Sequence, residues 1–209
     1  MKLFQKTSLD PDDWNLSEHY RLFGCLSESR KDAKRILEIG TESGSFTSFL
    51  GKAFEDASIV SLDLPLDAGM TRLYGREDGQ AYKSRQWENV RLLESVSLRE
   101  LNSVSLTGIE TQPFDLISVD GDHSTPVVTI DLVNSLWVLQ SGGPVVVDDV
   151  ISRAPRRENP MQSLGALSAL RALEFAGVIP PPPNIFEETS LAREQCSINC
   201  KMDCCGPKN

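Results

Sequence analysis

The stretch that most constrains the fold is residues 114–123, FDLISVDGDH, in which an apolar run turns abruptly acidic. The apolar half is rich in β-branched residues, which is typical of a buried strand. The acidic half brings Asp120 and His123 directly after it. Because open α/β sheets bind ligands beyond the carboxyl ends of their strands, the stretch predicts a buried strand that delivers these side chains to a functional edge.

A second apolar run, residues 144–147, ends in Asp148 and Asp149. Two buried strands of one sheet can bring their terminal carboxylates together. Carboxylates with a histidine beside them favour a site for a hard divalent cation with a base next to it. The alternative is that these acids are solvated loop residues and helix caps. The coincidence of two acidic strand ends with one histidine favours the functional interpretation.

The segment from residue 36 to residue 63 has the pattern of a nucleotide-binding opening. A predicted strand at 36–39 is followed by the glycine turn GTESG and by a helix whose apolar residues share one face. Gly40 allows a tight turn, and Gly44 allows a ligand close to the helix start. A second strand at 58–62 ends in Asp63, an acid placed to accept hydrogen bonds from a ribose. This pattern predicts a doubly wound, mostly parallel α/β sheet.

The remaining elements are predicted from periodicity and from helix-capping residues. A helix with Ser17 as N-cap precedes the first strand, and residues 64–86 lack periodicity, which favours a lid or substrate-side loop over a simple surface insertion. The other predictions are a third strand at 90–93 ending at Glu94 and Ser95, a helix marked by Leu98, Leu101 and Val104, a helix capped by Thr125, a helix at 164–176, and antiparallel strands at 185–188 and 197–202. We expect one domain over 1–209: an N-terminal helical extension (1–34), a core (35–150), and a C-terminal helix, proline-rich connector and cysteine-rich end (151–209).

Charge and hydropathy limit the possible partners. The chain of 209 residues has a formal net charge of −9, which argues against nucleic acid or an anionic membrane surface as partner. The first residues have no long apolar core, and no run approaches the length of a membrane span. We therefore expect a soluble, cytoplasmic protein without nucleic-acid or membrane partners, and a homo-oligomer is left open.

Four motifs together carry a family resemblance: LEIGTESGSFTSFL, SLD, FDLISVDGDHS and GGPVVVDD. They resemble those of class I S-adenosylmethionine (SAM)-dependent methyltransferases, whose fold is a Rossmann-like α/β sheet. The closer resemblance is to metal-dependent small-molecule O-methyltransferases, typified by macrolide-sugar and cephalosporin-biosynthesis methyltransferase-like proteins. The resemblance implies transfer of a methyl group from SAM to a hydroxyl of a small molecule, assisted by a divalent cation such as Mg²⁺.

The resemblance also implies roles for individual residues. The expected cofactor-binding residues are Glu38, Gly40, Thr41, Gly44, Asp63, Ser95 and Asp120, with Asp63 at the ribose and Ser95 near the adenine. The expected metal ligands are Asp120, Asp148 and Asp149, and His123 is the expected general base. One departure is Glu42, where the broader superfamily often has a third glycine.

Two alternative functions remain beside this interpretation. An NAD(P)-dependent oxidoreductase would need glycine at positions 42 and 45, where this chain has Glu42 and Ser45. A non-catalytic binding protein on a methyltransferase scaffold is disfavoured by the intact acidic set.

The terminal cysteines, Cys196, Cys200, Cys204 and Cys205, lack CxxC spacing, and we expect reduced, non-catalytic thiols, with a zinc site as the main alternative.

Overall fold

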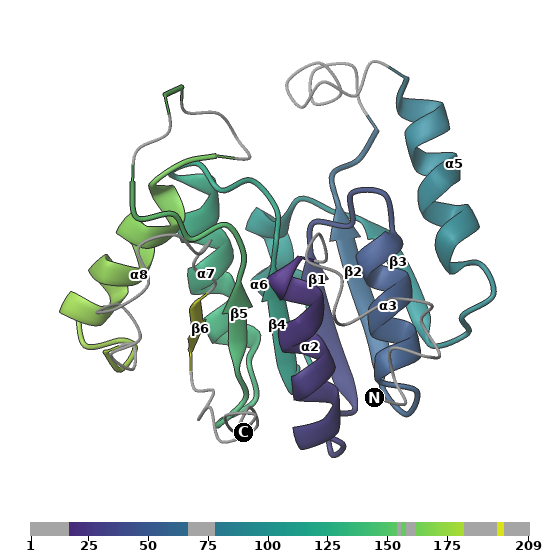
Figure 1. Cartoon of the computed structure of the whole chain (residues 1–209), viewed down its shortest axis with the longest axis horizontal. Coiled ribbons are helices and arrows are strands. Elements are labelled where there is room, and N and C mark those ends of the chain that lie inside the picture. Colours follow the sequence, from purple (N-terminus) through teal and green to yellow (C-terminus); the bar gives the residue numbers. More distant parts are fainter. Residues whose placement is uncertain (1–16, 67–77, 154–155, 158–161, 182–195, 199–209) are drawn as a thin grey trace, which may run out of the picture.

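The computed structural model describes residues 17–66, 78–153, 156–157, 162–181 and 196–198. Its centre is a six-stranded sheet in the order β3-β2-β1-β4-β5-β6 (Figure 1). The strands are β1 (Arg35–Ile39), β2 (Ser58–Asp63), β3 (Val96–Glu100), β4 (Leu116–Val119), β5 (Val145–Val147) and β6 (Cys196–Ile198). Strands β1 to β5 pair in parallel and β6 pairs antiparallel with β5. The predicted doubly wound, mostly parallel α/β fold is confirmed.

Helices cover both faces of the sheet. They are α2 (Glu18–Ser29), α3 (Ser45–Ala53), α5 (Gly79–Val90), the 3₁₀ turn η1 (Ser103–Ser105), α6 (Leu106–Ile109), α7 (Val127–Val138) and α8 (Gly165–Phe175). Helices α2 and α3 lie side by side in front of the sheet in Figure 1. Helix α2 begins at the predicted N-cap, Ser17, whose side chain accepts a hydrogen bond from the backbone N–H of His19.

Strand residues alternate between two apolar clusters because successive side chains of a strand point to opposite faces. Ile36, Ile59, Leu116 and Val146 pack with the phenylalanines of α2 and α3. Their neighbours, among them Leu37, Val60, Ile117 and Val147, pack with α6, α7 and α8. We call the first side of the sheet the α2–α3 face. Helix α2 is thus part of one core cluster of the domain.

Three predictions between β2 and β4 differ from the structure. The loop predicted over 64–86 ends in helix α5, which spans 79–90, and its residues 67–77 lie outside the described part of the chain. The third strand is Val96–Glu100 rather than 90–93. Val90 is the last residue of α5, and Leu98 lies inside β3 instead of in the helix that follows. The buried residues of α5 include Lys83 and Gln86, so the inner face of the helix is partly polar and gives no apolar period.

The described elements of the C-terminal half agree with the predictions except at one cap. Helix α7 begins at Val127 with Pro126 as N-cap and without a side-chain cap, so Thr125 is not the predicted N-cap. Strand β6 confirms a terminal antiparallel strand at Cys196–Ile198. The predicted strand at 185–188 and Cys200, Cys204 and Cys205 lie outside the described residues. Among the described helices, none is long and apolar enough to cross a membrane.

Candidate active site

A row of polar side chains crosses the three central strands on the α2–α3 face. Glu38 of β1 is in register with Ser61 of β2 and with Ser118 of β4. All three are fully buried, at positions where the strand alternation would otherwise place apolar residues. Helices α2 and α3 supply their partners, so this face changes from apolar to polar as the strands approach their carboxyl ends.

Glu38 is the centre of this polar row. The hydroxyl of Thr47 donates to Glu38 Oε2 over 2.6 Å, while Glu38 Oε1 is buried without a hydrogen-bond partner. Burial raises the pKa of Glu38 to about 7, against the lowering effect of hydrogen bonds from Ser61 and Thr47. The hydroxyls of Thr41 and Ser61 are 2.7 Å apart. A buried acid with an unused oxygen suits a cationic ligand group, such as an ammonium.

The glycine turn after β1 packs directly on the end of β4. Gly40 has φ +101°, and a Cβ there would lie 2.0 Å from the carbonyl oxygen of Asp120. Gly44, the N-cap of α3, has φ +80°, and a Cβ there would lie 3.1 Å from the carbonyl oxygen of Gln86. Both positions therefore require glycine. Glu42, between them, also has a positive φ of 47°, which explains why glycine is favoured at this position.

Asp63 ends β2 and faces helix α5. Its Oδ1 accepts from the backbone N–H of Leu64, and its Oδ2 lies 3.4 Å from Lys83 Nζ and accepts from the Gln86 side-chain amide. The residue is 8 % exposed. The structure thus places Asp63 at the predicted edge and shows that two polar residues of α5 orient its carboxylate.

The predicted position of Ser95 is wrong. Ser95 precedes β3, and its carbonyl accepts from the backbone N–H of Ile59 near the start of β2. The residue paired with Asp63 is Glu100, the last residue of β3. Because the strands are parallel, Ser95 lies at the opposite end of the sheet from Asp63, away from the glycine turn. The error follows from placing the third strand six residues too early.

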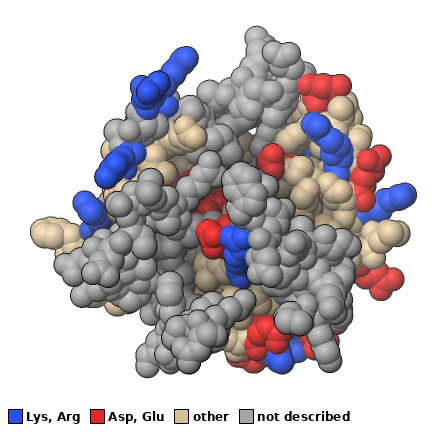
Figure 2. All heavy atoms as spheres, in the orientation of Figure 1, with Lys and Arg blue, Asp and Glu red and all other residues tan. Residues whose placement is uncertain are grey.

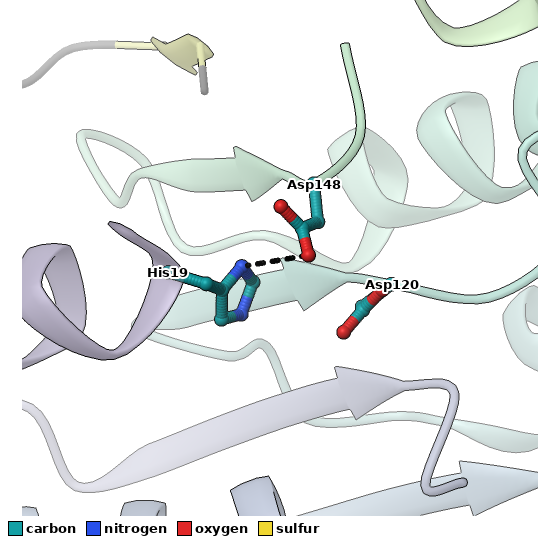
Figure 3. Close-up of side chains that lie close together, drawn as sticks. All are labelled: His19, Asp120 and Asp148. Atoms are coloured by element: carbon teal, nitrogen blue, oxygen red, sulfur yellow. Dashed lines mark ion pairs between the residues drawn. The ribbon is translucent and has the colours of Figure 1, made fainter. Parts of the chain in front are cut away.

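A second group forms where β4 and β5 end. Donor atoms of His19, Asp120 and Asp148 all lie within 4.8 Å of one another, and Figure 3 shows the three side chains converging from α2, β4 and β5. His19 Nδ1 lies 3.5 Å from Asp148 Oδ2. The side chains of Asp120 and Asp148 are 29 % and 17 % exposed, whereas His19 is buried. Two of the three predicted metal ligands are thus brought together, with a histidine in addition.

His123 lies beside Asp120, and the charge of Asp149 acts on it as well. His123 Nε2 is 3.5 Å from Asp120 Oδ1, and neither ring nitrogen has a hydrogen-bond partner. Burial would lower the pKa of His123, but Asp120, with Asp149 and Asp148, raises it overall. Asp149, which has a positive φ of 48°, is not part of the group formed with His19. Of the three predicted ligands, Asp149 is therefore the one outside this group, although its charge acts on His123 together with those of Asp120 and Asp148.

The edge of the sheet is rich in negative charge. Burial, with Asp148 adding, raises the pKa of Asp120, and burial, with Glu38, Glu42 and Asp120 adding, raises the pKa of Tyr20 to about 12. On the face in Figure 2, acidic atoms are visible near the centre with basic atoms directly beside some of them, and both kinds also lie toward the margins. Such a site favours positively charged ligands, for example a sulfonium, an ammonium or a divalent cation.

His19, Lys83 and Gln86 are the residues that the sequence interpretation missed. The sequence offered one weak signal for His19: the chain has two histidines, and the other one, His123, was already assigned to the site. Lys83 and Gln86 gave no signal without the helix that presents them. Lys83 and Gln86 thus gather with Asp63 at one end of the edge, and His19 gathers with Asp120 and Asp148 at the other.

Comparison with known proteins gives one family and several similar structures. Residues 37–150, more than half the chain, match the family described as Methyltransferase domain. A Klebsiella pneumoniae protein assigned as an O-methyltransferase is 25% identical, with a TM-score of 0.57 over 87% of this chain and 77% of that one. No curated protein sequence matches the chain significantly.

Two further structures share the fold at 20% identity. The SAH-bound methyltransferase PaMTH1 of Podospora anserina has a TM-score of 0.59 over 96% of this chain and 86% of its own. The O-methyltransferase TomG of Streptomyces achromogenes, involved in tomaymycin synthesis and solved with SAM, has a TM-score of 0.55 over 84% and 74%.

Proposed function

Because this chain belongs to the methyltransferase-domain family and is a SAM-dependent methyltransferase, we propose that it methylates a hydroxyl oxygen of a small molecule with the help of a divalent cation. Membership of this family argues against both alternatives, which were an oxidoreductase and a non-catalytic binding protein. The resemblance to macrolide-sugar and cephalosporin-type enzymes supports a small hydroxylated acceptor, as does the structural similarity to O-methyltransferases.

The proposed cofactor site runs along the ends of β1 and β2. The backbone around Gly40 and Gly44 can approach the ligand closely, and Thr41 lies on this turn. The unused Glu38 oxygen would meet the positive methionine end of the cofactor, and Asp63 would accept from the ribose hydroxyls. Lys83 and Gln86 hold the Asp63 carboxylate in a fixed orientation.

The proposed cation site lies between Asp120 and Asp148. Two carboxylates with donor atoms within 4.8 Å fit a divalent cation, which Asp149 would support through its charge. A cation bound there supplies positive charge that favours the ionised acceptor hydroxyl. Mg²⁺ is the ion that the sequence resemblance implies.

The protein's part in the reaction is alignment and proton removal. Transfer joins the acceptor oxygen to the methyl carbon and breaks the carbon–sulfur bond, so the sulfonium becomes a neutral thioether. The acceptor's proton passes to His123, whose ring nitrogens have no other hydrogen-bond partner. The remaining contribution is orientation of acceptor, methyl group and sulfur in one line.

His123 is buried behind Asp120, since its side chain is 1 % exposed and that of Asp120 is 29 % exposed. The proposal therefore requires that binding of the acceptor opens the path from the Asp120 carboxylate to the ring. If His123 acts as the base, His123→Ala slows methyl transfer by about 10²–10⁴-fold and leaves cofactor affinity unchanged. A variant that transfers at the wild-type rate would remove His123 from the reaction.

The single observation that supports this function most is that the glycine turn contacts the backbone of Asp120, an acid of the cation group. Cofactor and cation would therefore be neighbours. The test is transfer of labelled methyl from SAM to a panel of small phenols, sugars and alcohols, with and without chelator. We expect O-methylated product that chelator suppresses and added cation restores. Transfer that is indifferent to chelator would refute the cation's role, and transfer only to nitrogen or carbon would refute the acceptor class.

A further inference from the structure

We propose that His19 of helix α2 is a ligand of the cation through Nδ1, so that the site holds a first-row transition-metal ion in preference to Mg²⁺. This inference rests on the proposed cation site between Asp120 and Asp148 and extends it with a nitrogen donor. None of the metal ligands predicted from the sequence lies on α2.

The ring of His19 is held in place on all sides. His19 is 2 % exposed and lies in the first turn of α2, which begins at Glu18. It stacks on Phe23, with ring centroids 4.9 Å apart, and meets Phe46 of α3 edge-on at 4.2 Å. A buried imidazole fixed by two aromatic rings is preorganised as a ligand, because little rotamer freedom is lost when a cation binds.

The two ring nitrogens have different surroundings. Nε2 lies 3.1 Å from the hydroxyl oxygen of Ser118, a buried residue of β4. When Nε2–H donates to Ser118, Nδ1 carries the lone pair. Metal-binding histidines almost always use their second nitrogen in this way, which fixes the tautomer and the ring orientation. Ser118 is thus the positioning residue of the proposed ligand.

Nδ1 points into the acidic group. It is buried, has no hydrogen-bond partner, and lies 3.5 Å from Asp148 Oδ2 (Figure 3). Buried polar atoms are rarely left unsatisfied, so a nitrogen that makes no hydrogen bond and has only this 3.5 Å contact with a carboxylate oxygen indicates a missing electrophile. The donor atoms of His19, Asp120 and Asp148 lie within 4.8 Å of one another, which is close enough for one cation to contact all three.

The donor set decides the class of ion. Mg²⁺ is bound through oxygen and retains several waters, whereas imidazole nitrogen suits first-row transition metals. One nitrogen and two carboxylates therefore favour Mn²⁺, Co²⁺, Ni²⁺ or Zn²⁺ over Mg²⁺. The remaining coordination positions stay open to water or to the acceptor.

The test uses Mn²⁺ and the full-length protein without substrate. Pulsed electron paramagnetic resonance detects an imidazole nitrogen bound to Mn²⁺, and the chain has two histidines that could supply it. In His19→Gln, the amide can keep the hydrogen bond to Ser118 but offers no Nδ1. We expect nitrogen coupling in the wild type and in the matched control His123→Gln, and its loss in His19→Gln.

Affinities give a second readout. We expect His19→Gln to weaken Mn²⁺ binding by at least about 10-fold, with little change in Mg²⁺ affinity, and Ser118→Ala to weaken Mn²⁺ binding by about 10- to 100-fold while keeping the coupling. Retained coupling in a folded His19→Gln, or Mn²⁺ binding to the wild type without coupling, would overturn the inference while leaving the proposed function intact. Binding of no divalent cation at all would overturn both cation proposals, and cofactor affinity measured in parallel reports the methyltransferase site separately.

Discussion

The backbone of Gly40 approaches that of Asp120 so closely that a Cβ on residue 40 would lie 2.0 Å from the Asp120 carbonyl oxygen. Gly40→Ala should therefore displace the cofactor turn and the cation acid together. We expect a loss of at least about 2 kcal/mol in unfolding free energy, from clash and strained φ, and loss of SAM binding by calorimetry.

The matched control for this change is Gly142→Ala. Gly142 also has a positive φ, +79°, but nothing lies within 4 Å of the added Cβ. It should lose only about 1–2 kcal/mol of stability, the strain of a left-handed residue, and bind SAM normally. Equal effects of the two substitutions would mean that contact with Asp120 does not position the turn.

Asp63 is the residue on which the proposed ribose contact depends. Asp63→Ala should weaken binding of S-adenosylhomocysteine by about 1.5–3 kcal/mol, because a buried charged acceptor is lost. Ser95→Ala is the control, since Ser95 lies at the opposite end of the sheet, and it should change affinity by less than about 0.5 kcal/mol. Calorimetric titration of both variants decides the assignment, and an unchanged affinity in folded Asp63→Ala would exclude the contact.

Glu38 makes stability depend on pH. Its pKa is raised to about 7 in the folded protein, so between its unfolded value and 7 the folded state binds more protons than the unfolded state. Stability is then highest at low pH in this range and falls as pH rises, by about 2–3 kcal/mol between pH 5 and 8.

Glu38→Gln tests this dependence because the amide keeps an acceptor for Thr47 but does not titrate. Urea unfolding at pH 5 and pH 8 should show a much smaller fall in stability for the variant than for the wild type. Asp131, buried with a pKa raised to about 6 chiefly by burial, contributes with the same sign and is unchanged in both proteins. An identical pH slope in the variant would show that Glu38 is ionised throughout.

The sequence was most informative where the chain is buried on both sides. Strands β1, β2, β4 and β5 are short apolar runs; Asp63 ends β2, and Asp120 and Asp148 directly follow β4 and β5. In a parallel sheet, strand ends meet at one edge, so sequence position determines spatial proximity. The glycine turn was equally readable, because positive φ at Gly40 and Gly44 demands that residue type.

The sequence was least informative where polar residues face inward. Helix α5 presents Lys83 and Gln86 to Asp63, so its buried face does not show an apolar period. Strand β3 is mostly half-buried, and the short apolar run before it has the sequence pattern of a strand, so the strand was predicted there. His19 was hidden for a related reason: it lies on the buried face of an amphipathic helix, and only the packing of α2 over β4 and β5 brings it to Asp148.

In the proposed function a cation and the reactive methyl group share one site, and this proximity can be measured without knowing the acceptor. Mn²⁺ enhances the nuclear relaxation of protons close to it, so the S-methyl protons of bound SAM report their distance from the ion. We predict strong enhancement in the wild type that is lost in Asp120→Asn and in Asp148→Asn, although both variants still bind SAM. Enhancement that is absent in the wild type, or that survives both substitutions, would show that no cation is bound at Asp120 and Asp148 beside the methyl group.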